Sequence, residues 1–200
     1  MRGARKETVM KTVSCAIAVA FCAVAHAVDV TTDTTVTISA DSDTPYNIAS
    51  GVTLKLTVPA GMTNTLSGAI TGGGAIRKEG EGGLRLSSTG NTFSGGMYTA
   101  VGTIFAAASG AFGTGGITNE WRACTVFDSQ GGVFPNDIYM LHDTGPGYSY
   151  PETAPIQFAK DATMNGDISA GSSVTTYLAN HRASTSPNTA RGRAWCSPAA

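Results

Sequence analysis

The stretch of sequence that decides the fold is residues 65–118, TLSGAITGGGAIRKEGEGGLRLSSTGNTFSGGMYTAVGTIFAAASGAFGTGGIT. Near its middle, alternate positions form a series that is apolar or glycine apart from one lysine: Ile76, Lys78, Gly80, Gly82, Leu84 and Leu86. A period of two residues indicates extended strand with one face turned to a core. Glycines in the inward row leave room where the chain turns a tight corner or a neighbouring layer comes close.

Lys78 is the charged residue of this inward series. We expect its aliphatic stem to lie over a corner while its ammonium group reaches water. The alternative is an ion pair with Glu79 or Glu81 of a neighbouring layer.

Two further features follow in the same stretch. Residues 91–96 read NTFSGG, and because Asn and Gly tolerate positive φ, they predict a turn. Met97, Thr99 and Val101 then share one parity up to Gly102, whereas Ile104 lies on the other. A glycine at such a change of phase is typical of a bulge or a corner.

The neighbouring segments carry related signals. Residues 28–59 alternate in the same way, and after residue 27 no stretch shows a sustained apolar period of 3.6 residues. Residues 65–71 and 163–169 share a short pattern of Thr, apolar, small polar, Gly, any residue, Ile and hydroxyl. Their separation would hold several coils of about 20–25 residues each. Residues 121–155 fit the pattern least and are expected to loop out of the stack.

The first 27 residues predict an export signal. Four basic residues lie in the first eleven positions, and an apolar run too short to span a bilayer follows at residues 13–25. The run ends in Ala25-His26-Ala27, the small-x-small pattern that signal peptidase accepts. We therefore expect cleavage between Ala27 and Val28.

Composition limits the kind of partner. Without the leader the basic residues fall from 13 to 9 and the acidic ones from 14 to 13, which leaves a formal charge of −4. An acidic chain argues against nucleic acid as a partner. Cys124 and Cys196 remain after cleavage, and neither a disulfide framework nor a metal-ligand spacing is expected from them.

Three blocks taken in order resemble the autotransporter-associated β-strand repeat, also called the passenger-associated transport repeat. They are residues 76–86 (IRKEGEGGLRL), residues 91–96 (NTFSGG) and residues 102–104 (GTI). Phe93 stands where the family usually has Tyr, and Ile104 where it has Leu. The positions that carry the resemblance are Ile76, Lys78, Gly80, Gly82, Leu84, Leu86, Asn91, Thr92, Phe93, Ser94, Gly95, Gly96, Gly102, Thr103 and Ile104.

This resemblance implies an all-β fold, a right-handed parallel β-helix (a solenoid) over residues 28–181, after a cleaved signal peptide of residues 1–27. Passengers of this family cross the outer membrane of Gram-negative bacteria and form stalks or adhesive surfaces outside. The resemblance therefore implies a secreted or cell-surface, structural or adhesive role without catalysis, with a host-surface or glycan ligand. The repeat brings no catalytic residue, cofactor or metal.

The end of the chain predicts something different. Residues 182–200 are basic, contain proline and do not alternate, so we expect a disordered or truncated tail. A complete autotransporter ends in a membrane barrel of alternating strands, and nothing after His181 has that pattern. The outer-membrane translocator is therefore expected not to be encoded in this chain.

The sequence gives only weak indications of a catalytic or ligand-binding site. Residues 143–145 (Asp-Thr-Gly) match the triplet around an aspartic-protease carboxylate, but no second triplet supplies the partner, and a turn is expected. His142 and His181 are expected in surface loops. The aromatic residues between Phe127 and Tyr150 suit either a sugar-binding platform or, as we favour, a hydrophobic cluster under a loop.

Two alternatives stay open. One is a polysaccharide-processing β-helix enzyme, which needs carboxylates gathered on one face. The acids here are scattered along the chain: Glu79, Glu81, Asp128, Asp137, Asp161 and Asp167. The other alternative is a truncated remnant with no independent activity.

Overall fold

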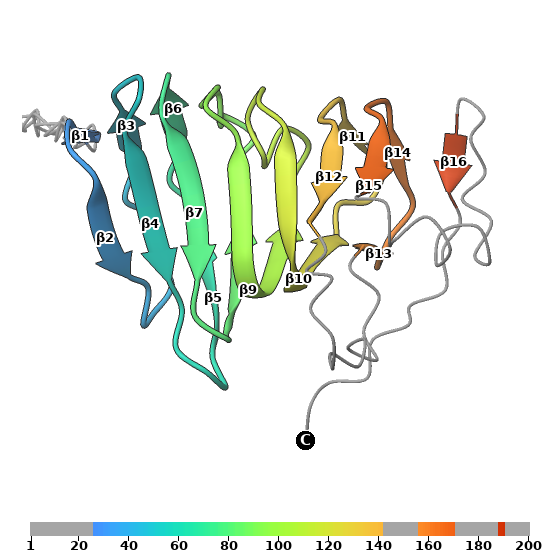
Figure 1. Cartoon of the computed structure of the whole chain (residues 1–200), viewed down its shortest axis with the longest axis horizontal. Helices are drawn as coiled ribbons and strands as arrows, with labels where there is room; N and C mark the ends of the chain where they lie inside the picture. The colour runs from blue at the N-terminus through green and yellow to red at the C-terminus, as the bar shows by residue number, and fades with distance from the viewer. Residues whose placement is uncertain (1–25, 142–155, 171–187, 191–200) are drawn as a thin grey trace, which may run out of the picture.

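The computed structural model describes residues 26–141, 156–170 and 188–190, and within them every regular element is a β-strand (Figure 1). The first eight strands are β1 (Val28–Val30), β2 (Thr34–Thr37), β3 (Tyr46–Ile48), β4 (Thr53–Thr57), β5 (Thr63–Leu66), β6 (Ile70–Gly72), β7 (Ala75–Glu79) and β8 (Gly83–Leu86). The remaining strands are β9 (Met97–Ala106), β10 (Ile117–Phe127), β11 (Gly132–Phe134), β12 (Ile138–Met140), β13 (Ile156–Phe158), β14 (Ala162–Met164), β15 (Ile168–Ala170) and β16 (Asn188–Ala190).

The strands stack in parallel as a β-solenoid, apart from β16, which pairs antiparallel with β14, so the expected fold class is confirmed. The largest sheet follows the path β15-β12-β10-β9-β7-β4-β2, and Figure 1 shows its members side by side in nearly the order of the chain. We call this the β4–β7 face. A second row, the β5–β8 face, contains β5, β8, the second halves of β9 and β10, and β13. A third side carries the short sheet β1-β3-β6 in the first coils and β11-β14-β16 in the last ones.

Each coil takes about 20 residues because residues one coil apart pair in register. Ile76 pairs with Met97, 21 positions later, and Ile117 with Ile138, again 21 positions later. The later coil is longer, since Gly132 pairs with Ala162, 30 positions later. The additional ten or so positions lie between β12 and β13.

The core is built from inward rows that run from coil to coil. One row contains Leu54, Ile76, Met97 and Ile117, and all four side chains are at most 2% exposed. Burying a side chain of this size contributes roughly 1.5–3 kcal/mol. Because a single coil cannot bury its own apolar row, the stability depends on its neighbours.

Phenylalanines fill the core of the later coils. The rings of Phe127 and Phe134 lie 4.7 Å apart, and Phe112 meets Phe127 edge-on at 5.9 Å. All three side chains are fully buried. Phe127 and Phe134 therefore belong to the core and do not form a sugar-binding platform. Tyr148 and Tyr150 lie outside the described residues.

The expectation that residues 121–155 loop out of the stack is wrong for their first part. β10 runs without interruption to Phe127, and β11 and β12 add regular short strands up to Met140. Phe127 and Phe134 occupy core positions, whereas Pro135 and Tyr139 are exposed on the outside of the stack, and the composition alone did not distinguish this arrangement from a loop. Residues 142–155 lie outside the described part of the chain.

Contrary to expectation, the short pattern shared by residues 65–71 and 163–169 does not mark equivalent positions in two coils. Residues 65–71 join β5 to β6, whereas residues 163–169 join β14 to β15, so the two copies lie at different corners of the coil. They share the use of their glycine: a Cβ on Gly68 would collide with the Thr44 carbonyl, and one on Gly166 with the Asn136 carbonyl. The shared pattern therefore indicates a tight corner in each place, and the distance between its two copies is not a whole number of coils.

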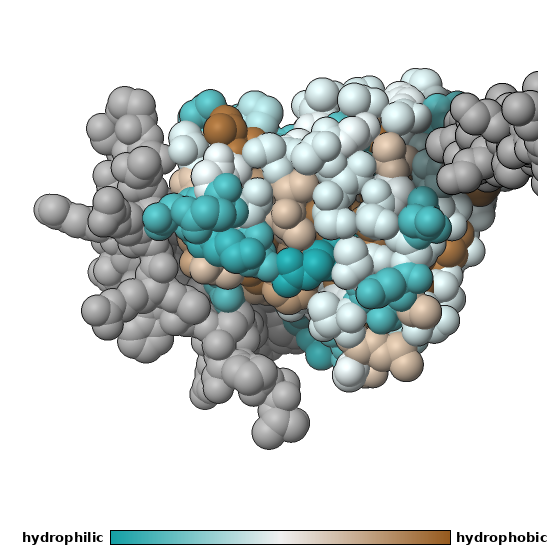
Figure 2. All heavy atoms as spheres, turned by 180° about the vertical axis from the view of Figure 1, so that it is seen from behind, coloured by the Kyte–Doolittle hydropathy of each residue, from teal (hydrophilic) through white to brown (hydrophobic). Residues whose placement is uncertain are grey.

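The face seen in Figure 2 is mainly of intermediate hydropathy, with separate hydrophilic clusters and scattered hydrophobic patches. The outward positions of the long faces carry mostly Thr, Ser and charged residues, for example Thr35, Lys55 and Arg77 in one row. Among the described residues, no helix has the length and apolar character needed to cross a membrane.

Candidate functional site

Two of the three repeat-like blocks, residues 76–86 and 102–104, meet at one corner of the solenoid between the β4–β7 and β5–β8 faces, whereas residues 91–96 lie on the third side against β6. β7 leads into this corner, β8 leaves it, and β9 passes over it in the next coil. Ile76, Leu84 and Leu86 are 0% exposed and point into the core. Gly80 has a φ of +78°, which an L side chain rarely adopts, and so it turns the chain between the two faces.

Lys78 is wholly buried at this corner, and the expectation that its ammonium reaches water is wrong. Its Nζ donates to the carbonyl oxygens of Gly80 and Gly82 in the same corner. It also donates to the carbonyl of Val101 in the next coil, at 3.0 Å. Three carbonyls replace water around the ammonium, a possibility that alternation alone could not reveal.

The ion pair considered for Lys78 is absent from the described residues. Glu79 pairs with Arg77 on the outer face, with Nε and Oε1 2.7 Å apart. Glu81 lies near Arg122, with the guanidinium 3.5 Å from Oε1. Burial lowers the pKa of Lys78 from 10.5 to about 8. The ammonium is therefore still mostly protonated at neutral pH and is held by dipoles alone.

Gly102 forms the matching corner in the next coil. Its φ is +75°, and a Cβ there would stand 2.6 Å from the Lys78 Nζ. Before it, Met97 and Thr99 are buried, and after it Ile104 is buried, so the predicted change of phase occurs at this glycine. Thr103, beside it in the motif, is partly exposed.

Asn91 connects three coils through its side chain. Its Oδ1 accepts from the Ile70 backbone N–H at 2.8 Å, and its Nδ2 donates to the Ala111 carbonyl at 2.8 Å. Ile70 lies in the coil before Asn91 and Ala111 in the coil after it. Asn91 has no positive φ, so the reason expected for its place in the turn is wrong.

The rest of the NTFSGG block packs closely on the preceding coil. Phe93 is 0% exposed, while Thr92 and Ser94 are exposed and donate their backbone N–H groups to the Ile70 and Gly72 carbonyls. A Cβ on Gly95 would collide with the backbone of Gly74. Gly96, with a φ of +92°, returns the chain to β9.

The inward row that contains Lys78 is polar for three coils. Thr99 follows Lys78 in register, and Asn119 follows Thr99. The Thr125 hydroxyl donates to the Asn119 Oδ1 at 3.0 Å, and all these side chains are at most 1% exposed. The corner of the core is therefore a buried polar column between two apolar rows.

A cluster of charged and aromatic side chains lies on the outside of the β4–β7 face. The Arg77 guanidinium lies 4.3 Å from the centre of the Tyr98 ring, and the Tyr98 hydroxyl donates to Glu120. Burial and this hydrogen bond raise the pKa of Tyr98, with Arg77 acting in the opposite sense. The cluster satisfies its own charges and stabilises neighbouring coils modestly.

A second charged cluster lies beside the β5–β8 face. Asp128 accepts from Arg85 and lies 3.0 Å from the Lys160 Nζ. Burial alone would raise the pKa of Asp128, but the two cations outweigh it and lower that pKa. The Arg85 guanidinium also lies 5.1 Å from the Phe105 ring centre.

The remaining acids do not build a catalytic group within the described residues. Asp137 accepts from the Asp167 backbone N–H at 2.8 Å, and Asp161 is exposed. No three His, Cys, Asp or Glu side chains of the described ranges are grouped so that they could hold a metal ion. His142, Asp143 and His181 lie outside those ranges, as does Cys196, while Cys124 is buried.

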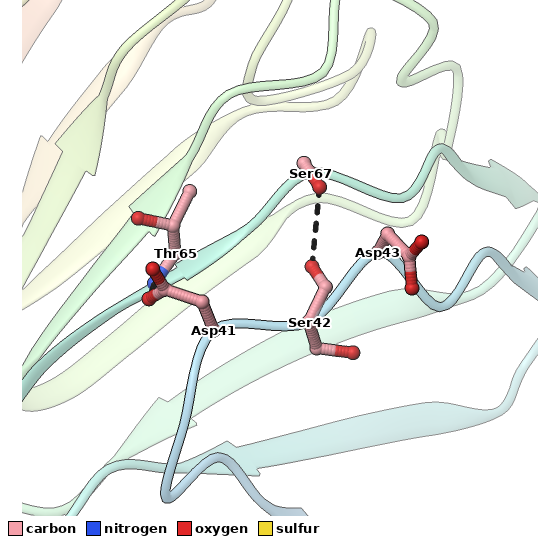
Figure 3. A pocket seen from close by; sticks show the side chains of 5 residues that line it. All are labelled: Asp41, Ser42, Asp43, Thr65 and Ser67. Carbon is pink, nitrogen blue, oxygen red and sulfur yellow. Dashed lines mark hydrogen bonds between the residues drawn. The ribbon is translucent and has the colours of Figure 1, made fainter.

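A shallow hollow near the start of the solenoid is polar (Figure 3). It is lined by Asp41, Ser42, Asp43, Thr65 and Ser67. Asp41 already accepts from the Thr65 backbone N–H at 2.7 Å, and the Ser67 hydroxyl donates to the Ser42 carbonyl at 3.3 Å. These groups serve the contact between coils.

The predicted cleavage point lies at the edge of the fold. Residues 1–25 of the leader fall outside the described residues. Val28 is the first residue of β1, and its N–H donates to the Pro45 carbonyl at 2.9 Å. Ala27 precedes the strand without belonging to it.

Comparisons with known proteins point in one direction. The chain is 35% identical over 104 residues to the adhesin BmaC autotransporter of Brucella suis biovar 1 (strain 1330). The match covers 52% of this chain but only 3% of that adhesin. No protein-family model and no solved structure matches the chain. The chain is thus a β-solenoid that is similar to a small part of a bacterial autotransporter adhesin.

Proposed function

We propose that this chain is a segment of a surface-exposed or secreted bacterial passenger that acts as an adhesin-like structural element and not as an enzyme. The observation that carries the proposal is the likeness of half of the chain to an autotransporter adhesin, in a chain that folds as a parallel solenoid. A solenoid offers long faces whose residues repeat at the strand spacing, a form suited to extended contact.

The ligand we propose is a host-surface molecule or a glycan. Outward positions supply hydroxyl groups and scattered side chains of both charges, and Tyr139 is 42% exposed on the β4–β7 face. Aromatic rings and hydroxyl-rich surfaces suit sugar rings, which present one apolar face and many hydroxyl groups.

Export by a cleaved signal peptide belongs to the same proposal. Because Val28 opens β1, cleavage after Ala27 would remove the leader without shortening a strand. N-terminal sequencing of the exported protein tests this point, and a mature protein that begins within the apolar run or after β1 would contradict it.

Adhesion is tested by displaying residues 28–200 on a non-adherent bacterium through a fused anchor. We expect attachment to host cells or to arrayed glycans above that of the anchor alone. The same assay is run with Leu84→Asp, which places a charge in the core, and with Val133→Asp at a position that is 46% exposed. Attachment should be lost in the first variant and kept in the second. No attachment above the anchor, or equal attachment by Leu84→Asp, would refute the adhesive role.

A further inference from the structure

Three backbone carbonyls converge on one point inside the corner between β7 and β8. Those of Gly80 and Gly82 come from the corner itself, and that of Val101 comes from β9 in the next coil. The Lys78 ammonium occupies the point and donates to all three. A protonated primary amine has three donors and no acceptor, so its hydrogen-bonding capacity is fully used.

Glycines give the corner its shape. Gly80 and Gly102 both have φ near +75° (+78° and +75°), and the carbonyls of Gly80 and of Val101, which precedes Gly102, point to the ammonium. A Cβ on Gly102 would stand 2.6 Å from the Lys78 Nζ and 2.7 Å from the Gly80 oxygen. A side chain there would displace the ammonium from its place.

Carboxylates do not hold the ammonium. Within the described residues the carboxylates on the adjoining strands and corner pair with arginines on the outer surface: Glu79 and Glu120 with Arg77, and Glu81 with Arg122. The inward neighbours in register are Leu56 on one side and Thr99 on the other. The positive charge therefore meets neutral dipoles from two successive coils.

We infer that the carbonyls of Gly80, Gly82 and Val101 form a binding site for a primary ammonium group, which the chain fills with its own Lys78. Since two carbonyls belong to one coil and the third to the next, filling the site ties the two coils together in one register. A slip of β9 by two residues would remove the Val101 carbonyl and leave a buried ammonium without its third acceptor. Buried polar groups that set register in this way are known from other folds.

The test is to empty the site and refill it from solution. Lys78→Ala removes Cγ to Nζ, the four heavy atoms that propylammonium contains. Buried cavities in protein cores admit small ligands that match them. We expect propylammonium chloride to raise the Tm of Lys78→Ala saturably, by about 4 °C at ten times its Kd. Wild type and Lys78→Met, whose stems fill the space, should not respond.

Two control additives distinguish the effect of the N–H donors of propylammonium from the effects of its charge and of its hydrocarbon chain. Tetramethylammonium chloride supplies the same ionic strength without N–H donors, and 1-propanol supplies the chain without the charge. Ile76→Ala opens a cavity two positions away on the same strand, where no carbonyl cage exists, and should not respond to propylammonium. A Tm rise in Ile76→Ala, an equal rise with either control additive, or no rise at all would overturn the inference.

The design also covers a variant that fails to fold. If Lys78→Ala is unfolded in buffer, the same titration is followed by far-ultraviolet circular dichroism. Recovery of the strand spectrum with propylammonium, but not with tetramethylammonium, supports the site. Absence of recovery at concentrations that leave the wild-type spectrum unchanged counts against it.

Discussion

The Lys78 ammonium lies 2.6 Å from the point where a Cβ on Gly102 would stand, although the two residues are 24 positions apart in the chain. The lysine belongs to one coil and the glycine to the next. The buried position of the Lys78 ammonium therefore requires a glycine at position 102.

Gly102→Ala should destabilise the protein more than a positive φ alone explains. Gly51 has a similar φ of +77°, and nothing lies within 4 Å of the point where its Cβ would stand, so Gly51→Ala measures the cost of the backbone conformation alone, about 1 kcal/mol. We expect Gly102→Ala to cost about 3 kcal/mol, because it also displaces the ammonium from its carbonyls. Urea unfolding of both variants gives the comparison. Equal losses would show that Gly102 is required only for its φ.

The buried lysine also predicts a pH dependence of stability. Its pKa is about 8 in the folded protein and 10.5 in the unfolded chain, so between these values the unfolded state binds more protons. The free energy of unfolding should therefore gain from this group as pH rises from about 8 to 10.5, by about 3 kcal/mol, and lose that gain as pH falls back to 8.

Lys78→Met supplies the reference for that measurement. Tyr46 and Tyr98 have raised pKa values, which lowers stability at high pH in both proteins and cancels in the difference. Urea midpoints of wild type and Lys78→Met are compared at pH 7 and at pH 10. A difference that stays constant across this range would contradict the predicted titration.

Asn91→Ala should be costly because two partners lose their bonds at once. The Ile70 N–H and the Ala111 carbonyl would each be left buried, and we expect a loss of about 2–4 kcal/mol in the free energy of unfolding. The control is Asn47→Ala, which removes an exposed hydrogen bond to Asp29 and should cost less than about 0.5 kcal/mol. Chemical denaturation separates the two. A small loss for Asn91→Ala would mean that water replaces its contacts.

Asp128→Asn tests the charged cluster beside the β5–β8 face. The pKa of Asp128 is lowered in the folded protein, so the carboxylate adds stability above its unfolded pKa, and this is lost as pH falls through its folded value. Since Arg85 and Lys160 are partly exposed, the loss at pH 7 should be only about 1 kcal/mol and should shrink in 1 M salt. Thermal unfolding at low and high salt measures it. An unchanged difference at high salt would argue for a packing effect.

The sequence allowed the architecture to be predicted where its signal is periodic. The inward parity of Ile76, Leu84 and Leu86 follows from a two-residue period, and the corner at Gly102 follows from the change of phase. Both are local properties, which the sequence expresses directly. The coil length of 21 residues agrees with the range of about 20–25 residues expected from the repeat lengths of such folds.

What the sequence could not supply are contacts between coils. The surroundings of Lys78 depend on a carbonyl one coil away, and those of Asn91 on partners in the coils before and after it. Such pairings can be recognised only once the register is known, which is why the sequence led us to expect the Lys78 ammonium in water and Asn91 in a simple turn. The same limit applies to the first part of residues 121–155, whose phenylalanines find their place only in a stacked core.

The lengthened coil between β12 and β13 shows how this architecture tolerates change. Strands on both sides keep their partners, since Ile138 pairs with Ile168 and Thr125 with Ile156, although the chain between them is about ten positions longer. The additional residues between β12 and β13 therefore leave the hydrogen-bonded ladder on both sides intact. An epitope tag or a foreign binding loop inserted between Met140 and Ile156 should therefore cost the scaffold little stability.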